Sequence, residues 1–186
     1  MGQGRMAHLT AVTPQAVAGD NTTEARRQQY VERANAGVGQ ALHTQKFRGS
    51  IGNYTLVDVD FDPAAAWHAV VRYEVPLDWC HSFDPSQPIG EGNAPVAQGG
   101  LLCALMDNAM TTALRVATGG RFQTTLSMTN EFLAPGRPGL HWAEAKCTMI
   151  GGTVGFAVVT LFADEARTDV VARSTSTNKL RKPAKL

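Results

Sequence analysis

One short stretch of the chain has the residue types and spacing for stabilising an oxyanion beside a nucleophile or base. Gly99 and Gly100 stand where the chain is predicted to enter a helix, and Asp107 follows eight residues after Gly99. The first N–H groups of a helix lack internal acceptors and lie at its positive end, so they can hold a developing negative oxygen. A carboxylate can attack a carbon centre or activate water, and the sequence leaves both roles open for Asp107.

These residues fall within a predicted helix over 96–114. Ala, Leu and Met fill its interior without a proline, and apolar residues cover most of its circumference, which is typical of an enclosed helix. Periodicity alone favours reading the remaining polar stripe as a solvent-exposed face. The stripe consists of Asp107, Asn108, Thr111, Thr112 and Arg115.

Gly99 and Asp107 are too far apart in one helix to act on the same carbonyl group. At about 1.5 Å per residue, they lie about 12 Å apart along the axis. If both act on one substrate, Asp107 of one chain must meet Gly99 of another, which requires two antiparallel helices about a two-fold axis. The spacing therefore predicts that catalysis needs at least a homodimer.

The flanking sequence predicts an antiparallel sheet around this helix, hence an α+β fold class. Consecutive strands joined by short turns favour antiparallel pairing, and Gly119 and Gly120 are predicted to end the helix. Alternating apolar and polar residues predict strands over 54–61, 67–75, 122–133, 140–149, 153–162 and 170–177.

The N-terminal part of the chain is predicted to lie outside the main domain. Residues 1–20 show no periodicity and are expected to form a flexible leader. Residues 21–40 predict a peripheral helix, with Thr22 or Thr23 as its N-cap. The range 41–186 is then the globular domain, and its loop over 76–95 is of a kind often placed for function.

Composition narrows the function classes. A net charge of +1 argues against a nucleic-acid partner, which needs a concentrated basic face. Three cysteines without a CxxC pair predict neither a disulfide framework nor a zinc site, and no metal is expected. The chain shows no signal-peptide pattern and no apolar run of bilayer length, so we expect a cytoplasmic protein without a membrane partner.

Several of these features together are similar to a known family. Gln98-Gly99-Gly100, the following Asp107, the strand end at 132–135 and the nearby Gly139 resemble the hotdog-fold acyl-CoA thioesterases, specifically the PaaI-like group of the phenylacetate pathway. The resemblance is close over 93–180 and loose over 54–75. It implies a six-stranded antiparallel sheet wrapped around one long helix, homodimers or homotetramers, and an acyl-CoA substrate whose coenzyme A is no separate cofactor.

The resemblance also assigns roles to residues. Gly99 matches a glycine whose N–H holds the thioester oxygen, Asp107 the catalytic carboxylate, and Thr125 a hydroxyl that assists it. Asn93 lies one residue from an amide that orients the thioester. Gln98 replaces the family's histidine; it can orient the loop or the thioester but cannot act as an acid or base near neutral pH.

Further residues are expected to contact the substrate, and two other functions stay open. Gly100 and Thr111 are assigned to substrate binding, and Arg137 and Lys179 are candidates for the coenzyme A phosphates, although each alone is commonly solvated surface. Replacement of the histidine by Gln98 favours a non-catalytic acyl-CoA-binding protein as one alternative. An enoyl-thioester hydratase or dehydratase is the other, and it normally needs that histidine.

Overall fold

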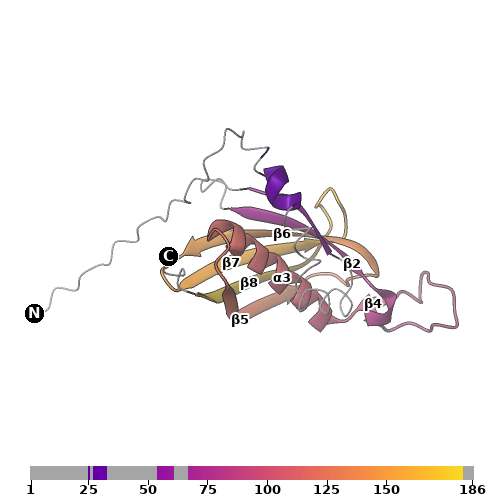
Figure 1. Ribbon diagram of the computed structural model, residues 1–186. Helices are drawn as coiled ribbons and strands as arrows, with labels where there is room; N and C mark the ends of the chain where they lie inside the picture. The colour runs from indigo at the N-terminus through magenta and orange to yellow at the C-terminus, as the bar shows by residue number, and fades with distance from the viewer. Residues whose placement is uncertain (1–24, 26, 33–53, 61–66, 182–186) are drawn as a thin grey trace, which may run out of the picture.

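The computed structural model describes residues 25, 27–32, 54–60 and 67–181. One long helix lies across a face of a six-stranded antiparallel sheet, as predicted (Figure 1). The strand order is β1-β2-β6-β7-β8-β5. The elements of this layer pair are β1 (Tyr54–Val59), β2 (His68–Val75), α3 (Gly99–Ala117), β5 (Gln123–Phe132), β6 (Gly139–Ile150), β7 (Val154–Phe162) and β8 (Val170–Leu180).

Helix α3 is 19 residues long and forms the centre of the core. Its end is a Schellman motif: Gly120 N–H donates to the Arg115 carbonyl at 2.9 Å, and Gly119 has a φ of +64°. This confirms the predicted helix end. The apolar helix residues that are buried against the sheet include Leu101, Leu105, Met106, Ala109, Met110 and Leu114.

Helix α3 begins at Gly99, where the glycine pair predicted that the chain enters it, and not at residue 96, where the stretch assigned to the helix begins. Val96–Ala97 instead form β4, which pairs with β3 (Cys80–His81) after a short 3-10 helix, η2 (Leu77–Trp79). The two-residue ladder closes the loop over 82–95 at its base. It thereby fixes the direction in which the chain enters α3.

Small residues on the inner face of the sheet let α3 approach closely. Ala143, Ala145 and Ala157 are fully or almost fully buried there. Gly155 on β7 has no room for a side chain, because a Cβ atom would lie 2.8 Å from Leu114 Cδ2. Larger residues at these positions would separate the helix from the sheet.

Strand β5 lies at an edge of the sheet and is not regular. It pairs with β8, and its register shifts between Thr125 and Ser127, where Leu126 is the extra residue of a β-bulge. A bulge changes which side of the strand the following residues face. As a result Gln123 before the bulge and Met128 after it both lie on the inner face, which strict alternation in the sequence cannot predict.

The extra N-terminal helix is present. Residues 25 and 27–32 are helical, while the predicted leader over 1–20 and both ends of the predicted helix lie outside the described residues. Arg27 Nη2 forms an ion pair with Asp58 Oδ2 of β1 at 2.6 Å, and Tyr30 and Val31 pack against the core. The helix is therefore attached to the edge of the sheet formed by β1.

A buried histidine lies in β6. His141 is 1% exposed, its Nδ1 lies 3.2 Å from the Gly139 carbonyl oxygen, and its Nε2 has no hydrogen-bond partner among the described residues. Burial lowers the pKa of His141, while the Gly139 carbonyl and the charge of Asp169 partly oppose this effect. Folding therefore favours the neutral form of the ring.

We expect acid to destabilise the fold through this ring. As the pH falls through about 6.5, the unfolded chain takes up a proton that the folded chain does not, so the free energy of unfolding decreases by up to about 1.4 kcal/mol per pH unit. His141→Leu removes this contribution. Urea unfolding at pH 7.5 and 5.5 measures it, with exposed His81→Gln as the control. Equal pH dependence in wild type and His141→Leu would contradict the assignment.

Candidate active site on helix α3

The first turn of α3 presents backbone donors without partners. Gln98 is the N-cap, and its Oε1 accepts from the Leu101 N–H at 3.0 Å. Within the part of the chain that the structure describes, the amides of Gly99 and Gly100 donate to no acceptor. Two adjacent N–H groups at the positive end of a helix can bind an anionic oxygen.

The backbone conformation at Gly99 and Gly100 does not require glycine. Neither has a positive φ, so the pair is not a tight turn that needs the conformational freedom of glycine. A Cβ atom on Gly99 would lie 3.4 Å from the Phe132 ring, an ordinary contact, whereas one on Gly100 would lie 2.7 Å from Gln98 Oε1 and displace the cap. Glycine weakens a helix by about 1 kcal/mol relative to alanine. Because Gly99 has no side chain, a ligand can approach its amide closely.

Asp107 lies two turns further along α3 and is held by the sheet. Thr125 Oγ1 donates to Asp107 Oδ1 at 2.7 Å, and the same hydroxyl oxygen lies 3.1 Å from Asn178 Oδ1. Thr125 and Asn178 are directly opposite in the β5–β8 register. The structure thus brings together two predicted residues, Asp107 and Thr125, and adds Asn178, which the sequence analysis missed.

Thr125 reaches the helix from the inner face of β5, just before the β-bulge. It precedes the extra residue, Leu126, and shares the inner face with Gln123, whose Nε2 donates to the Thr111 carbonyl at 2.6 Å. Bulges commonly redirect side chains next to active sites. Asp107 and Thr125 are half-buried beside the open edge of the sheet.

The polar stripe of α3 is therefore more than a solvent-exposed face. Asn108 Oδ1 accepts from the buried Tyr73 hydroxyl at 2.8 Å, and Thr112 Oγ1 donates to the Asn108 carbonyl at 2.9 Å. Thr111 is half-buried, and its described contact is through the backbone carbonyl. Only Arg115 in this stripe is exposed.

An apolar pocket of about 340 Å³ lies beside the free amide of Gly99. It combines the first turn of α3 with the end of β5, where Phe132 and Leu133 are 52% and 55% exposed. Its other lining residues are Val96, Ala97, Leu102, Ala134, Pro135 and Gly136. The pocket can hold an apolar group next to the free amides of Gly99 and Gly100.

Two residues predicted to bind substrate support the segment that leads to α3 in this structure. Asn93 Oδ1 accepts from the Asp84 N–H at 2.6 Å, and its Nδ2 contacts three carbonyls of the same loop. Arg137 Nη1 donates to the carbonyls of Ala94 and Pro95, each at 2.9 Å. Both side chains thus fix the segment that leads to Gln98.

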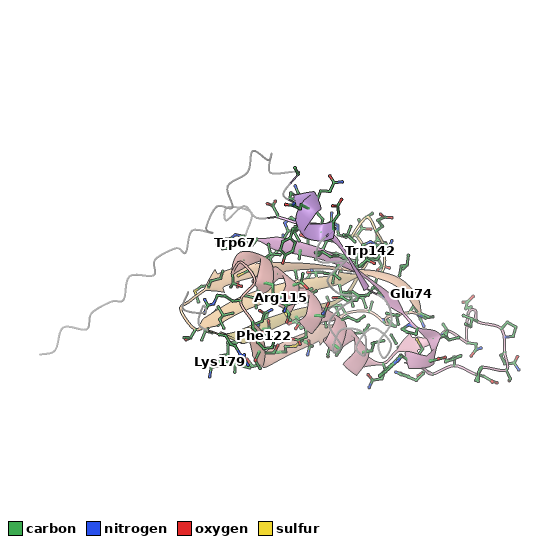
Figure 2. The ribbon with its side chains drawn as sticks, viewed as in Figure 1. Trp67, Glu74, Arg115, Phe122, Trp142 and Lys179 are labelled. Atoms are coloured by element: carbon green, nitrogen blue, oxygen red, sulfur yellow. The ribbon has the colours of Figure 1, made fainter. Side chains whose placement is uncertain are left out.

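Lys179 lies apart from Asp107, on the other face of β8. It is exposed and opposite Thr124, at the end of the sheet where Figure 2 also labels Phe122. The Arg181 guanidinium lies over the Phe122 ring at 4.8 Å from its centroid. Two cations, Lys179 and Arg181, therefore extend from this end of the sheet.

Cys103 does not have the surroundings of a nucleophile. Burial raises the pKa of its thiol, which disfavours the reactive thiolate. Among the described residues, no group of three or more His, Cys, Asp or Glu side chains could hold a metal ion. In the same part of the chain no helix combines the length and apolar character needed to cross a bilayer.

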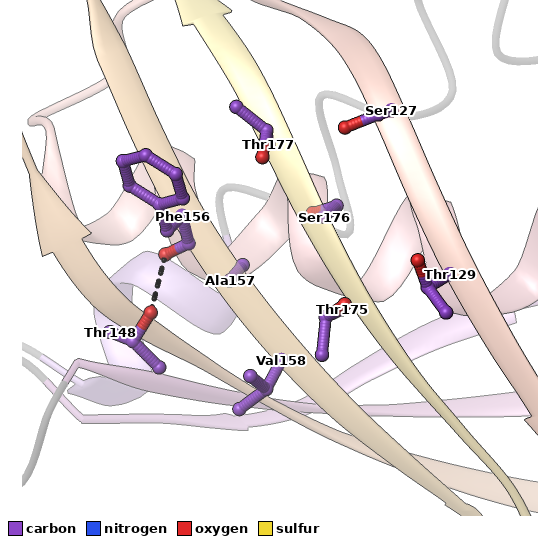
Figure 3. A pocket seen from close by; sticks show the side chains of 9 residues that line it. All are labelled: Ser127, Thr129, Thr148, Phe156, Ala157, Val158, Thr175, Ser176 and Thr177. Carbon is purple, nitrogen blue, oxygen red and sulfur yellow. Dashed lines mark hydrogen bonds between the residues drawn. The ribbon is translucent and has the colours of Figure 1, made fainter.

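A second pocket, of about 330 Å³, lies on the sheet away from the predicted site residues. Hydroxyl groups dominate its lining, as Figure 3 shows for Ser127, Thr129, Thr175 and Thr177. Thr148 Oγ1 donates to the Phe156 carbonyl at 3.3 Å within it. It contains no titratable side chain, so it offers no acid, base or charged ligand for chemistry.

Comparison with known proteins supports the predicted relationship. The sequence model of the thioesterase superfamily matches residues 95–177, which contain the whole of α3 and β5–β7 and most of β8. No curated protein sequence matches the chain.

Solved structures confirm the fold. A phenylacetic acid degradation-related protein of Ralstonia eutropha JMP134 is 23% identical with a TM-score of 0.58, covering 81% of this chain and 98% of its own. The E. coli PaaI protein from the phenylacetic acid degradation operon is 19% identical with a TM-score of 0.59, covering 83% and 95%. A hypothetical thioesterase from Streptococcus pneumoniae, solved with coenzyme A, is 18% identical with a TM-score of 0.58, covering 78% and 100%.

Proposed function

We infer, from a hotdog-fold chain whose residues 95–177 match the thioesterase superfamily, that the protein hydrolyses acyl-CoA thioesters to a free acid and coenzyme A. One observation carries this proposal: the same helix has unpartnered amides at its start and a carboxylate, Asp107, two turns later. Acyl transfer needs both groups, one for the oxygen that becomes negative and one to attack or activate water.

In this mechanism the thioester oxygen binds the Gly99 amide, and Gly100 N–H lies next to it. Asp107 either attacks the thioester carbon and expels the coenzyme A thiolate, leaving a mixed anhydride that water then hydrolyses, or removes a proton from a water that attacks the carbon and expels the thiolate. In both routes the thiolate takes up a proton and leaves as free coenzyme A. Thr125 holds the carboxylate in position. Gln98 caps the helix and orients the glycine amides, without any acid or base role.

The proposed active site is shared between two chains. Asp107 and Thr125 lie at the open edge of β5, and edge strands readily pair with another chain. Leu126, Phe132 and Leu133 leave apolar side chains more than half exposed along this strand. Pairing about a two-fold axis would cover them and bring Asp107 of one chain toward Gly99 of the other. A homodimer, or a homotetramer built from such dimers, is therefore the proposed active form.

Substrate recognition is proposed to divide between two regions. The apolar pocket beside Gly99 suits the acyl group, and the cations Lys179 and Arg181, at the opposite end of β5, are proposed to meet the coenzyme A phosphates of a substrate that is bound across two chains. Arg137, already bonded to two carbonyls, has guanidinium N–H groups that could also meet a phosphate. We expect the protein to act in the cytoplasm, where its three free thiols suit a reducing environment.

A hydrolysis panel tests the proposal. Acyl-CoA thioesters of increasing length, together with an aromatic one, are incubated with the protein, and free thiol and free acid are measured. Release of both in equal amounts is the expected result, and acyl-pantetheine, which lacks the phosphates, should show a higher KM. Tight binding without release would instead favour the acyl-CoA-binding alternative. Water addition to an enoyl-CoA without thiol release would favour the hydratase.

A further inference from the structure

We propose that Asn178, buried beneath the site, is a positioning residue that acts on Asp107 through the Thr125 hydroxyl. The proposal rests on the proposed function for its catalytic consequence. Its structural basis is the chain of contacts from Ser176 through Asn178 and Thr125 to Asp107. Of these residues, Asn178 is fully buried and Ser176 is 5% exposed.

Asn178 is an unusual residue for its place in the core. It lies on the inner face of β8, where its neighbour at the strand end is the buried Leu180. Burying an amide is unfavourable unless its polar atoms have partners, and each end of the Asn178 amide faces a hydroxyl group. Its Nδ2 donates to Ser176 Oγ at 2.8 Å, which directs the carbonyl oxygen, Oδ1, toward Thr125.

The Thr125 hydroxyl has a choice of two acceptors for its single hydrogen. Asp107 Oδ1 lies at 2.7 Å and Asn178 Oδ1 at 3.1 Å. While Asp107 is charged, the shorter, charge-assisted bond to the carboxylate is the stronger one. The Asn178 Oδ1 atom then remains as a second acceptor to which the Thr125 hydroxyl can turn.

The choice changes during the proposed reaction. When Asp107 bonds to the acyl carbon or takes up a proton from water, its negative charge disappears and its oxygen becomes a weaker acceptor. The Thr125 hydrogen can then turn to Asn178 without losing a partner. If Asn178 had no acceptor, the hydroxyl would be left unsatisfied in a half-buried site just as the reaction proceeds. Asn178 therefore lowers the energy of the step in which Asp107 loses its charge.

A double-mutant cycle separates this role from a merely structural one. We expect Asn178→Leu and Thr125→Val each to lower kcat about tenfold, the size of one net hydrogen bond, with KM changed less than about twofold. Adding Asn178→Leu to Thr125→Val should lower kcat no further than about twofold. A double variant about a hundredfold below wild type would show independent effects and overturn the proposal, as would an unchanged kcat in Asn178→Leu.

Ser174→Ala is the matched control. Ser174 is also buried on the inner face of β8, but its Oγ donates to the Thr129 carbonyl at 3.0 Å and not toward Asp107. We expect this variant to keep the wild-type kcat even if its thermal stability falls. Should Asn178→Leu fail to fold, Asn178→Ala replaces it in the cycle, with the same expected coupling to Thr125.

A measurement without substrate distinguishes failure of this proposal from failure of the proposed function. The ¹³C chemical shift of the Asp107 carboxyl carbon, assigned by its loss in Asp107→Asn, reports the hydrogen bond to Thr125. We expect Asn178→Leu to change this shift when Thr125 is present and to leave it unchanged beside Thr125→Val. Equal changes in both backgrounds would overturn the proposal, whether or not any acyl-CoA is hydrolysed.

Discussion

Asp107→Asn lowers kcat/KM for acyl-CoA hydrolysis by about a thousandfold or more, because it removes the only charged group of the proposed site that can attack the thioester or activate water. The asparagine keeps an oxygen at Oδ1, so the Thr125 hydroxyl retains its acceptor. We therefore expect little change in the melting temperature. A free-thiol assay on wild type and variant, with both proteins compared at equal oligomeric state, measures the loss.

Thr112→Val is a suitable control for this result. Thr112 belongs to the same polar stripe, but its hydroxyl donates to the Asn108 carbonyl within the helix. Its replacement should change kcat/KM by less than about threefold. Wild-type turnover in Asp107→Asn would show that the carboxylate has no part in the chemistry.

Gly99→Pro removes the proposed oxyanion donor and should lower kcat by about 100- to 1,000-fold, the usual effect of losing one such donor. Proline suits this position in every other respect. Gly99 is the first helical residue, where proline is favoured, and the preceding Gln98 has the extended conformation (φ −63°, ψ 127°) that proline requires. The helix should therefore form, and circular dichroism and thermal unfolding would verify it.

Gly99→Ala is the matched variant that keeps the N–H group. Its Cβ would meet the Phe132 ring at 3.4 Å, which is an ordinary contact. A large loss in Gly99→Pro with a much smaller one in Gly99→Ala assigns the effect to the amide. Similar losses in both variants would instead show that space beside the helix, not the donor, is what the reaction needs.

Much of the fold could be predicted because hydrophobic periodicity reflects burial directly. The predicted strands begin and end within three residues of the observed ones, and the glycine pair Gly119 and Gly120 marked the end of α3. The glycine pair Gly99 and Gly100 marked the entry to α3, but the strand that precedes it could not be predicted, since it depends on pairing of Val96–Ala97 with Cys80–His81 across the intervening loop. A two-residue ladder leaves no periodic signal.

The candidate site was predicted less completely, for related reasons. Thr125 meets Asp107 from the inner face of β5, but the bulge at Leu126 moves the residues after it to the other side, so alternation along the whole strand cannot tell which of its faces points inward. Asn178 was missed, although polar residues alternating at the inward positions of a core strand were a usable signal. Asn93 was assigned to the substrate through the family resemblance; its amide also holds together the loop in which it lies, which no sequence pattern indicated.

The shared active site is the central claim, and complementation between two inactive variants tests it most directly. Asp107→Asn and Gly99→Pro are co-expressed in equal amounts so that their chains mix. A site built from Asp107 of one chain and Gly99 of another is then intact in about a quarter of cases, so we predict about a quarter of the wild-type activity. Activity no higher than that of the two variants alone, in a preparation shown to contain mixed oligomers, would contradict the account.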